Sequence, residues 1–130
     1  MAVVYVVEDQ EGIARGMERI LSGMGHVARV FHDGLEAYAE VFERPPELLV
    51  LDVMLPSLNG LALARLVKFN EDLRHVPVLV VSAASDEVGG EATRVGVDGL
   101  LPKPFDPPAL VQEVERLLAG ETGGRALSQG

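Results

Sequence analysis

Residues 48–52 of the chain read Leu-Leu-Val-Leu-Asp, four apolar residues followed by a carboxylate. A short apolar run without polar alternation is typical of a strand that is buried on both faces. An ionised carboxylate at the end of such a strand is costly to bury without a partner. We therefore expect Asp52 to lie at an open edge of a sheet, where other polar groups meet it.

Three other apolar runs also have polar groups just past their ends. The carboxyl ends of parallel strands meet at one edge of a sheet, and this edge is where open α/β sheets bind their ligands. We therefore expect these polar groups to form one site with Asp52. The runs are residues 3–7, 76–81 and 99–101, and the groups are Glu8, Asp9, Ser82 and Lys103.

Amphipathic segments separate the apolar runs and are expected to form helices. The alternation of five strands with five helical segments predicts an α/β domain with a parallel sheet that is covered on both faces. Gly89 and Gly90 fall inside the fourth predicted helix, and each costs about 1 kcal/mol there relative to alanine. We expect that helix to be short, bent or mobile. The predicted helices are residues 10–22, 35–42, 61–69, 86–95 and 107–119, and a more exposed strand is predicted over His26–Phe31.

Composition limits the classes of function. A chain of 130 residues fits one domain, and we expect it over residues 1–120 with a flexible tail or the start of a linker over 121–130. The net charge of −9 argues against direct binding to nucleic acid, which needs a basic face. No cysteine is present, and the apolar start is too short for a signal peptide or a membrane span. A soluble cytoplasmic protein without membrane contact is expected.

The polar groups have the chemistry of a phosphoryl site. Glu8, Asp9 and Asp52 bring together carboxylates that repel one another unless a cation lies among them. Oxygen ligands without His or Cys suit Mg²⁺. Lys103 offers a positive charge for phosphate oxygens, and Ser82 offers a hydroxyl donor. A carboxylate in this setting is equipped to attack a phosphoryl group and to hold an aspartyl phosphate.

Each of these residues has an ordinary explanation when it is taken alone. Asp9 could be an acid that stabilises a helix N-terminus, Ser82 could cap the next helix, and Lys103 could be solvated. The matching positions after four strands favour the joint explanation. The aromatic side chains form no stripe that indicates a cofactor site, and we expect them to be packing residues. They are Phe31, Tyr38, Phe42 and Phe69.

The chain resembles the receiver domain of bacterial two-component response regulators over roughly residues 2–119. The resemblance implies a flavodoxin-like (βα)5 fold, a three-layer sandwich with a central parallel five-stranded sheet in the order 2-1-3-4-5. The pattern is distributed along the chain, which makes it more specific than any single motif. The residues that carry it are Glu8-Asp9, Asp52, Met54, Pro56, Gly60, Ser82-Ala83, Lys103-Pro104 and Phe105.

The resemblance also implies roles for individual residues. Asp52 would be the phosphoacceptor, Ser82 would contact the phosphoryl group, and Lys103 would pair with it. The protein would be a signalling switch and not an enzyme, beyond autophosphorylation and autodephosphorylation of its own aspartate. Mg²⁺ would be the cofactor. Its ligands would be Glu8, Asp9, Asp52 and the backbone carbonyl of Met54.

The implied partners are a histidine kinase or phosphotransfer protein, and a downstream protein target or an output domain absent from this chain. A homodimer through the face from the fourth to the fifth helix is a further partnership that the resemblance implies. Receivers commonly carry an aromatic residue three positions before the lysine, where it turns inward on activation, and here that position is Leu100. Together with the Gly89-Gly90 pair, this places the usual output relay in question.

Two alternatives remain open at the level of sequence. The first is a receiver fold that works as a scaffold or dimerisation module without phosphorylation, which Leu100 favours weakly. The second is a Mg²⁺-dependent phosphohydrolase with Asp52 as nucleophile. It is the least favoured, because Val53 and Met54 offer no second acid close after Asp52 to act as general acid.

Overall fold

The structure is a computed structural model that describes residues 1–120, except for the side chain of Ser85. The predicted tail over 121–130 lies outside the described residues. Strands and helices alternate along the chain without interruption. The elements are β1 (Val3–Val7), α1 (Glu11–Gly23), β2 (Val27–Phe31), α2 (Gly34–Glu43), β3 (Leu48–Asp52), α3 (Gly60–Lys68), β4 (Val78–Ser82), α4 (Ser85–Val95), β5 (Gly99–Pro102) and α5 (Pro107–Leu118).

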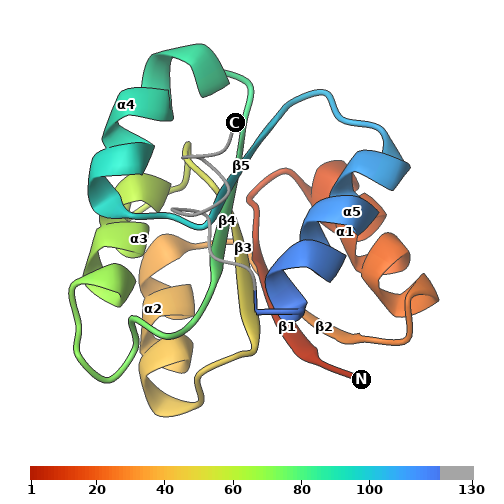
Figure 1. The fold of residues 1–130 in the computed structure, drawn as a ribbon, viewed down its shortest axis with the longest axis horizontal. Helices are drawn as coiled ribbons and strands as arrows, with labels where there is room; N and C mark the ends of the chain where they lie inside the picture. Colours follow the sequence, from red (N-terminus) through yellow and green to blue (C-terminus); the bar gives the residue numbers. More distant parts are fainter. Residues whose placement is uncertain (121–130) are drawn as a thin grey trace.

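All five strands are parallel and form one sheet in the order β2-β1-β3-β4-β5. Helices α2, α3 and α4 cover one face of the sheet, and α1 and α5 cover the other (Figure 1). This is the flavodoxin-like three-layer α/β sandwich, and the predicted fold class is confirmed. None of the helices in residues 1–120 is both long and apolar enough to cross a membrane.

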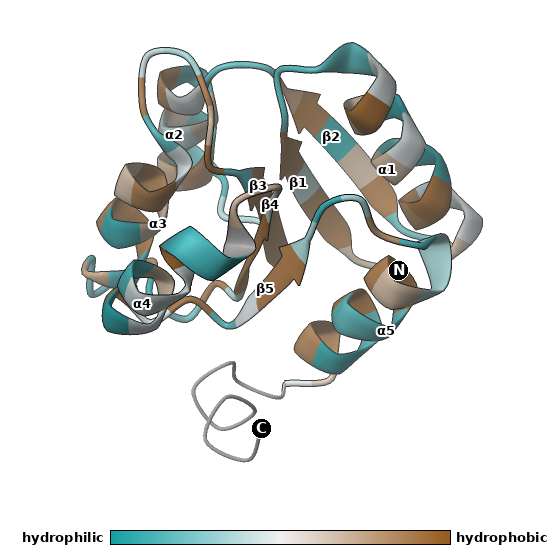
Figure 2. Cartoon of the chain, turned by 90° about the horizontal axis from the view of Figure 1, so that it is seen from above, coloured by the Kyte–Doolittle hydropathy of each residue, from teal (hydrophilic) through white to brown (hydrophobic). Residues whose placement is uncertain are grey.

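The core consists of two apolar layers, one on each face of the sheet. Every residue of β3 and of β4 is buried, as expected for central strands covered on both sides. The edge strand β2 alternates between exposed and partly buried residues before it ends at the buried Phe31, which confirms the prediction of a more exposed strand. Figure 2 shows the apolar strands enclosed between the two helical layers. The carboxyl end of β3 is therefore held rigidly from both faces.

Helix α4 differs from the prediction, because it runs without a break through Gly89 and Gly90. Tertiary packing offsets the low helix propensity of the two glycines. Ala92 and Val95 are buried against the sheet, and a Cβ at Gly89 would lie 3.9 Å from the side chain of Leu100 on β5. That distance is an ordinary van der Waals contact, so the packing of α4 on β5 does not itself require a glycine at this position.

The prediction for the aromatic residues was right for Phe31 and wrong for Phe42 and Phe69. Phe31 is buried and meets the ring of Tyr5 edge-on, with the ring centroids 5.1 Å apart. Phe42 and Phe69 are 60% and 64% exposed. Phe42 lies in the last turn of α2, and Phe69 directly follows α3. Both side chains lie on the side of their helix that faces away from the sheet.

Candidate functional site

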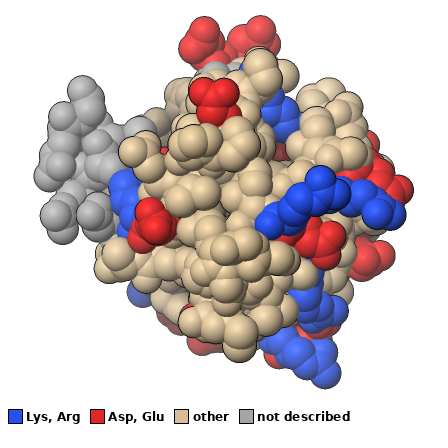
Figure 3. All heavy atoms as spheres, turned by 90° about the vertical axis from the view of Figure 1, so that its right-hand side faces the viewer, with Lys and Arg blue, Asp and Glu red and all other residues tan. Residues whose placement is uncertain are grey.

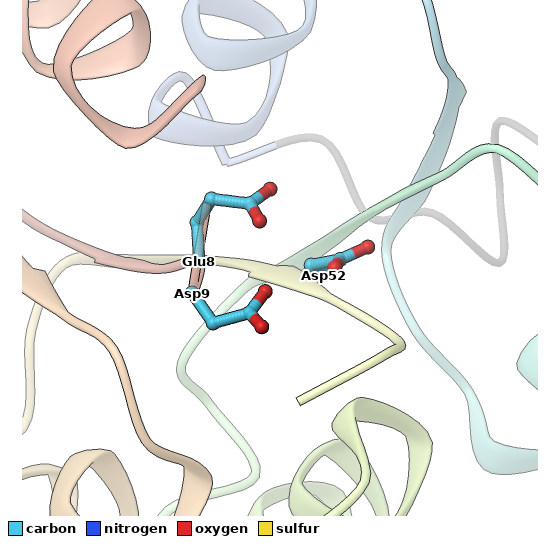
Figure 4. A group of neighbouring side chains, drawn as sticks. All are labelled: Glu8, Asp9 and Asp52. Atoms are coloured by element: carbon cyan, nitrogen blue, oxygen red, sulfur yellow. The ribbon is translucent and has the colours of Figure 1, made fainter. Parts of the chain in front are cut away.

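Three carboxylates gather at the carboxyl edge of the sheet. Glu8 and Asp9 follow β1 directly, and Asp52 is the last residue of β3. The two strands are neighbours, with Val7 paired to Leu51. One carboxylate oxygen from each residue lies within 4.8 Å of the other two (Figure 4). The predicted acidic cluster is therefore assembled by adjacent parallel strands.

Glu8 is the most buried member of the cluster, because none of its surface is exposed. Its Oε1 lies 2.8 Å from Nζ of Lys103, and its Oε2 accepts a hydrogen bond of 3.1 Å from the backbone N–H of Gln10. Lys103 Nζ lies 3.4 Å from Oδ1 of Asp52. The sequence predicted that Lys103 would pair with phosphate, but the contact with Glu8 was missed. The structure shows an ammonium shared between two carboxylates.

Ser82 and Lys103 are held together through the backbone. Ser82 ends β4 with 3% of its surface exposed, and its carbonyl accepts a hydrogen bond of 2.9 Å from the N–H of Lys103. Its Oγ accepts a hydrogen bond of 3.0 Å from the N–H of Ala84. Lys103 follows β5, and its peptide bond to Pro104 is cis. The ends of β4 and β5 therefore place both predicted side chains at the same edge as Asp52.

The loop from β3 to α3 packs directly on the backbone of Asp52. The N–H of Gly60, the first residue of α3, donates a hydrogen bond of 2.8 Å to the carbonyl of Val53. A Cβ at Gly60 would collide with the carbonyl of Asp52. Met54 lies in this loop, and its residue surface is 75% exposed. Gly60 is one of the residues that carry the resemblance to receiver domains. The structure shows why glycine is needed there, because a side chain would have no room beside Asp52.

Asp33 ties the same loop to the start of α2. Its side chain caps α2 by accepting hydrogen bonds from the N–H groups of Leu35 and Glu36. Its second oxygen accepts a hydrogen bond of 2.5 Å from the hydroxyl of Ser57, whose φ is 68°. The hydroxyl of Ser57, followed by the backbone donors, lowers the pKa of the Asp33 carboxyl. No pattern in the sequence indicated this link, because it joins residues 24 positions apart.

An apolar groove of about 390 Å³ borders the acidic cluster on the α1 side. It runs between α1 and the segment that follows β5, next to Lys103. Figure 3 shows that this side of the molecule carries a broad surface without charged side chains. Among its lining residues are Ile13, Met17, Ile20, Ala83 and Phe105.

The charges of the cluster favour a divalent cation. Three carboxylates meet one ammonium, so the group carries a net negative charge when all four are ionised. Like charges at such short separations repel, and a hard cation among the oxygens removes the repulsion. The donor set contains carboxylates and no His or Cys, which suits Mg²⁺.

We expect Asp9→Asn to weaken Mg²⁺ binding by roughly tenfold or more, because it removes a charged oxygen ligand from the cluster. Thermal unfolding with and without Mg²⁺ measures this, since a ligand that binds the folded state raises the unfolding temperature. Asp72→Asn is the matched control, an exposed aspartate outside the cluster. An Asp9→Asn variant with the same Mg²⁺-dependent rise as the wild type would exclude Asp9 as a ligand.

The fold and the site define a doubly wound α/β domain with an acidic centre at the carboxyl edge of its sheet. The family model described as the response regulator receiver domain matches residues 4–115. The chain therefore belongs to the response regulator receiver domain family. The predicted family is confirmed, and with it the general function of a phosphorylation-dependent signalling domain of two-component systems.

Individual proteins resemble this chain in sequence, in fold or in both. Response regulator MprA of Mycobacterium ulcerans is 36% identical over 118 residues, which cover 88% of this chain and 49% of MprA. A putative response regulator from Chloroflexus aurantiacus is 30% identical with a TM-score of 0.85, covering 91% of this chain and 98% of that one. The PA1611 receiver domain from Pseudomonas aeruginosa, solved with a magnesium ion in its active-site cleft, has a TM-score of 0.84 at 23% identity, covering 92% and 98%.

The chain spans a quarter to a half of the length of the curated relatives it matches. The matches thus concern the receiver part of these proteins. They do not favour the scaffold without phosphorylation over the phosphorylation-dependent switch.

Proposed function

We propose that Asp52 accepts a phosphoryl group, with Mg²⁺ bound, from the phosphohistidine of a histidine kinase or a phosphotransfer protein. The observation that carries the proposal is the convergence of Glu8, Asp9 and Asp52 around one point, with Lys103 as a shared cation. The receiver domain of PA1611, which shares the fold, holds a magnesium ion in its own active-site cleft, and this supports the proposal. The apolar groove that reaches Lys103 is the surface on which we place the phosphodonor protein.

The chemistry of the proposed step follows from the residues at the site. A carboxylate oxygen of Asp52 attacks phosphorus, an O–P bond forms, and the P–N bond to the donor imidazole breaks. The imidazole leaves as the neutral base once it holds a proton on one ring nitrogen. Bound Mg²⁺, held by Glu8, Asp9, Asp52 and the carbonyl of Met54, would neutralise charge on the phosphoryl oxygens. The domain acts on its own aspartate and not on a free substrate.

Lys103 and Ser82 would then respond to the new group. The phosphoryl group brings a charge of about −1.5 to −2 to the end of β3. Lys103 would turn from Glu8 toward a phosphoryl oxygen, because that oxygen offers it the stronger ion pair. The Ser82 hydroxyl would donate to another phosphoryl oxygen, which draws the segment at Ala84 toward Asp52. The start of α4 follows directly after this segment.

The signal would leave through α4 and β5. Leu100 is half-buried and packs where α4 crosses β5 at Gly89, so a shift of α4 changes this contact without an aromatic side chain. The output would be contact with a downstream protein, with an output domain outside this chain, or with a second copy across α4 and α5. We also propose that the protein acts in the cytoplasm and that it binds neither nucleic acid nor membrane directly.

Incubation with a small phosphodonor such as acetyl phosphate and Mg²⁺ is expected to add the mass of one phosphoryl group to the wild type. Asp52→Asn is expected to gain none, and Asp72→Asn, the matched exposed control, to gain as much as the wild type. Intact-mass spectrometry measures all three. If Asp52→Asn gained as much mass as the wild type, the phosphoacceptor would be another residue. If the wild type gained no mass, the proposal would be wrong.

A further inference from the structure

The face formed by α2 and α3 carries four of the seven large apolar side chains that are exposed within residues 1–120. None of the seven lies on α4, β5 or α5. The four are Leu35 at 54%, Phe42 at 60%, Leu66 at 40% and Phe69 at 64% exposure.

These side chains form one continuous patch. Helices α2 and α3 lie side by side on the same face of the sheet in both views (Figures 1 and 2). Leu35, Tyr38 and Phe42 follow one another at helical spacing along α2, and the rings of Tyr38 and Phe42 are 6.4 Å apart. A shallow hollow of about 340 Å³ joins Tyr38 to Leu66 and Phe69. We call this surface the α2–α3 patch.

The area of the patch suits a protein interface. With about 200 Å² for a whole phenylalanine, the two exposed rings present roughly 250 Å², and the two leucines add to this. A standard interface buries about 800 Å² on each partner, of which roughly 450–500 Å² is apolar. The phenylalanines alone thus supply about half of the apolar area that a stable interface needs. Aromatic side chains are also the residues that most often dominate binding.

The charges of the two helices are opposite, which makes the patch complementary to itself. Within its bounds α2 contains three glutamates and no lysine or arginine, and α3 contains Arg65 and Lys68 and no acid. Glu40 and Lys68 are engaged within the chain by Arg29 and Asp98. Exposed Glu36 and Glu43 can therefore face Arg65 of another copy. Arg65 meets Glu91 at 3.5 Å in a half-exposed pair, which is easily exchanged.

We propose that the α2–α3 patch binds a second copy of this chain in a two-fold symmetric dimer, with α2 of each copy on α3 of the other. Two-fold symmetry repeats each contact, so the α2–α3 patch of both copies is covered. The acidic helix α2 of each copy then meets the basic helix α3 of the other. An arrangement of α2 on α2 would instead place glutamates against glutamates. This dimer does not depend on phosphorylation, and it leaves α4, β5 and the groove beside Lys103 open.

Sedimentation equilibrium of the full chain, at concentrations up to about 1 mM, measures the dimer dissociation constant. We expect the wild type to dimerise, and Phe42→Ser and Phe69→Ser each to raise that constant by about 30-fold or more. Phe105→Ser is the matched control, a half-buried phenylalanine in the groove on the opposite layer, and is expected to leave the dimer dissociation constant unchanged. A wild type that stays monomeric at every concentration overturns the proposal. So does a dimer that Phe105→Ser weakens while the other two variants do not.

A charge exchange provides a second measurement. Arg65→Glu alone, and Glu36→Arg with Glu43→Arg, are each expected to prevent self-association, because like charges then meet across the interface. Mixing the two variants is expected to restore a dimer that contains one copy of each. The three substituted side chains are all exposed, so the variants should fold, and circular dichroism checks this. Failure of the mixture to associate, although the wild type dimerises, would assign the dimer to another face.

Discussion

The Lys103→Met variant is expected to have a free energy of unfolding about 3–5 kcal/mol below that of the wild type when Mg²⁺ is absent. Glu8 is fully buried, and Lys103 is the cation at 2.8 Å from its carboxylate. The substitution removes that charge and leaves Glu8 among two further carboxylates at Asp9 and Asp52. A buried charge that loses its partner loses the attraction that offset its desolvation, so the folded state is destabilised.

Denaturant unfolding in EDTA and in Mg²⁺ tests this expectation. Mg²⁺ should recover part of the loss in Lys103→Met, because it brings positive charge to the same carboxylates. Lys68→Met is the matched control, since Lys68 forms a comparably buried ion pair of 2.6 Å with Asp98 at the opposite edge of the sheet. Its loss of stability should not depend on Mg²⁺. A Lys103→Met variant as stable as the wild type in EDTA would show that the ammonium does not stabilise Glu8.

The sequence predicted the fold and the members of the cluster because both depend on short-range patterns. Each central strand is a continuous apolar run, and a parallel sheet has one carboxyl edge, so the pattern placed Asp52 and Asp9 at the same edge. That their strands are neighbours followed from the sheet order that the resemblance to receivers implied. The ends of the helices were predicted to within one residue, since glycine and proline mark several of them. Whether Asp52 is phosphorylated stays a prediction.

The side-chain contacts at the site could not be predicted in the same way. β1 is buried on both faces at its carboxyl end, so alternation does not decide which of Glu8 and Asp9 points inward. The pair of Glu8 with Lys103 joins residues 95 positions apart, and it depends on the twist of the sheet and the exact end of β5. The exposure of Phe42 and Phe69 was missed because an apolar residue near a helix end fits either the core or a binding surface.

Gly60→Ala is expected to lower the free energy of unfolding by about 3 kcal/mol or more, at the upper end of the cost of overpacking. The new methyl group would collide with the carbonyl of Asp52. Backbone cannot turn aside as a side chain can, and the hydrogen bond of 2.8 Å from the Gly60 N–H to Val53 holds α3 against this loop. The helix or the end of β3 must therefore move.

Gly16→Ala is the matched control, because a Cβ at Gly16 in α1 meets no atom within 4 Å. It is expected to raise the free energy of unfolding by about 0.5–1 kcal/mol, as alanine favours a helix interior more than glycine does. The two identical substitutions should thus have opposite signs in denaturant unfolding. Gly60→Ala should also slow labelling by acetyl phosphate, since the collision displaces the backbone that carries the Asp52 carboxylate. If Gly60→Ala were as stable as Gly16→Ala, the close packing of α3 on Asp52 would be disproved.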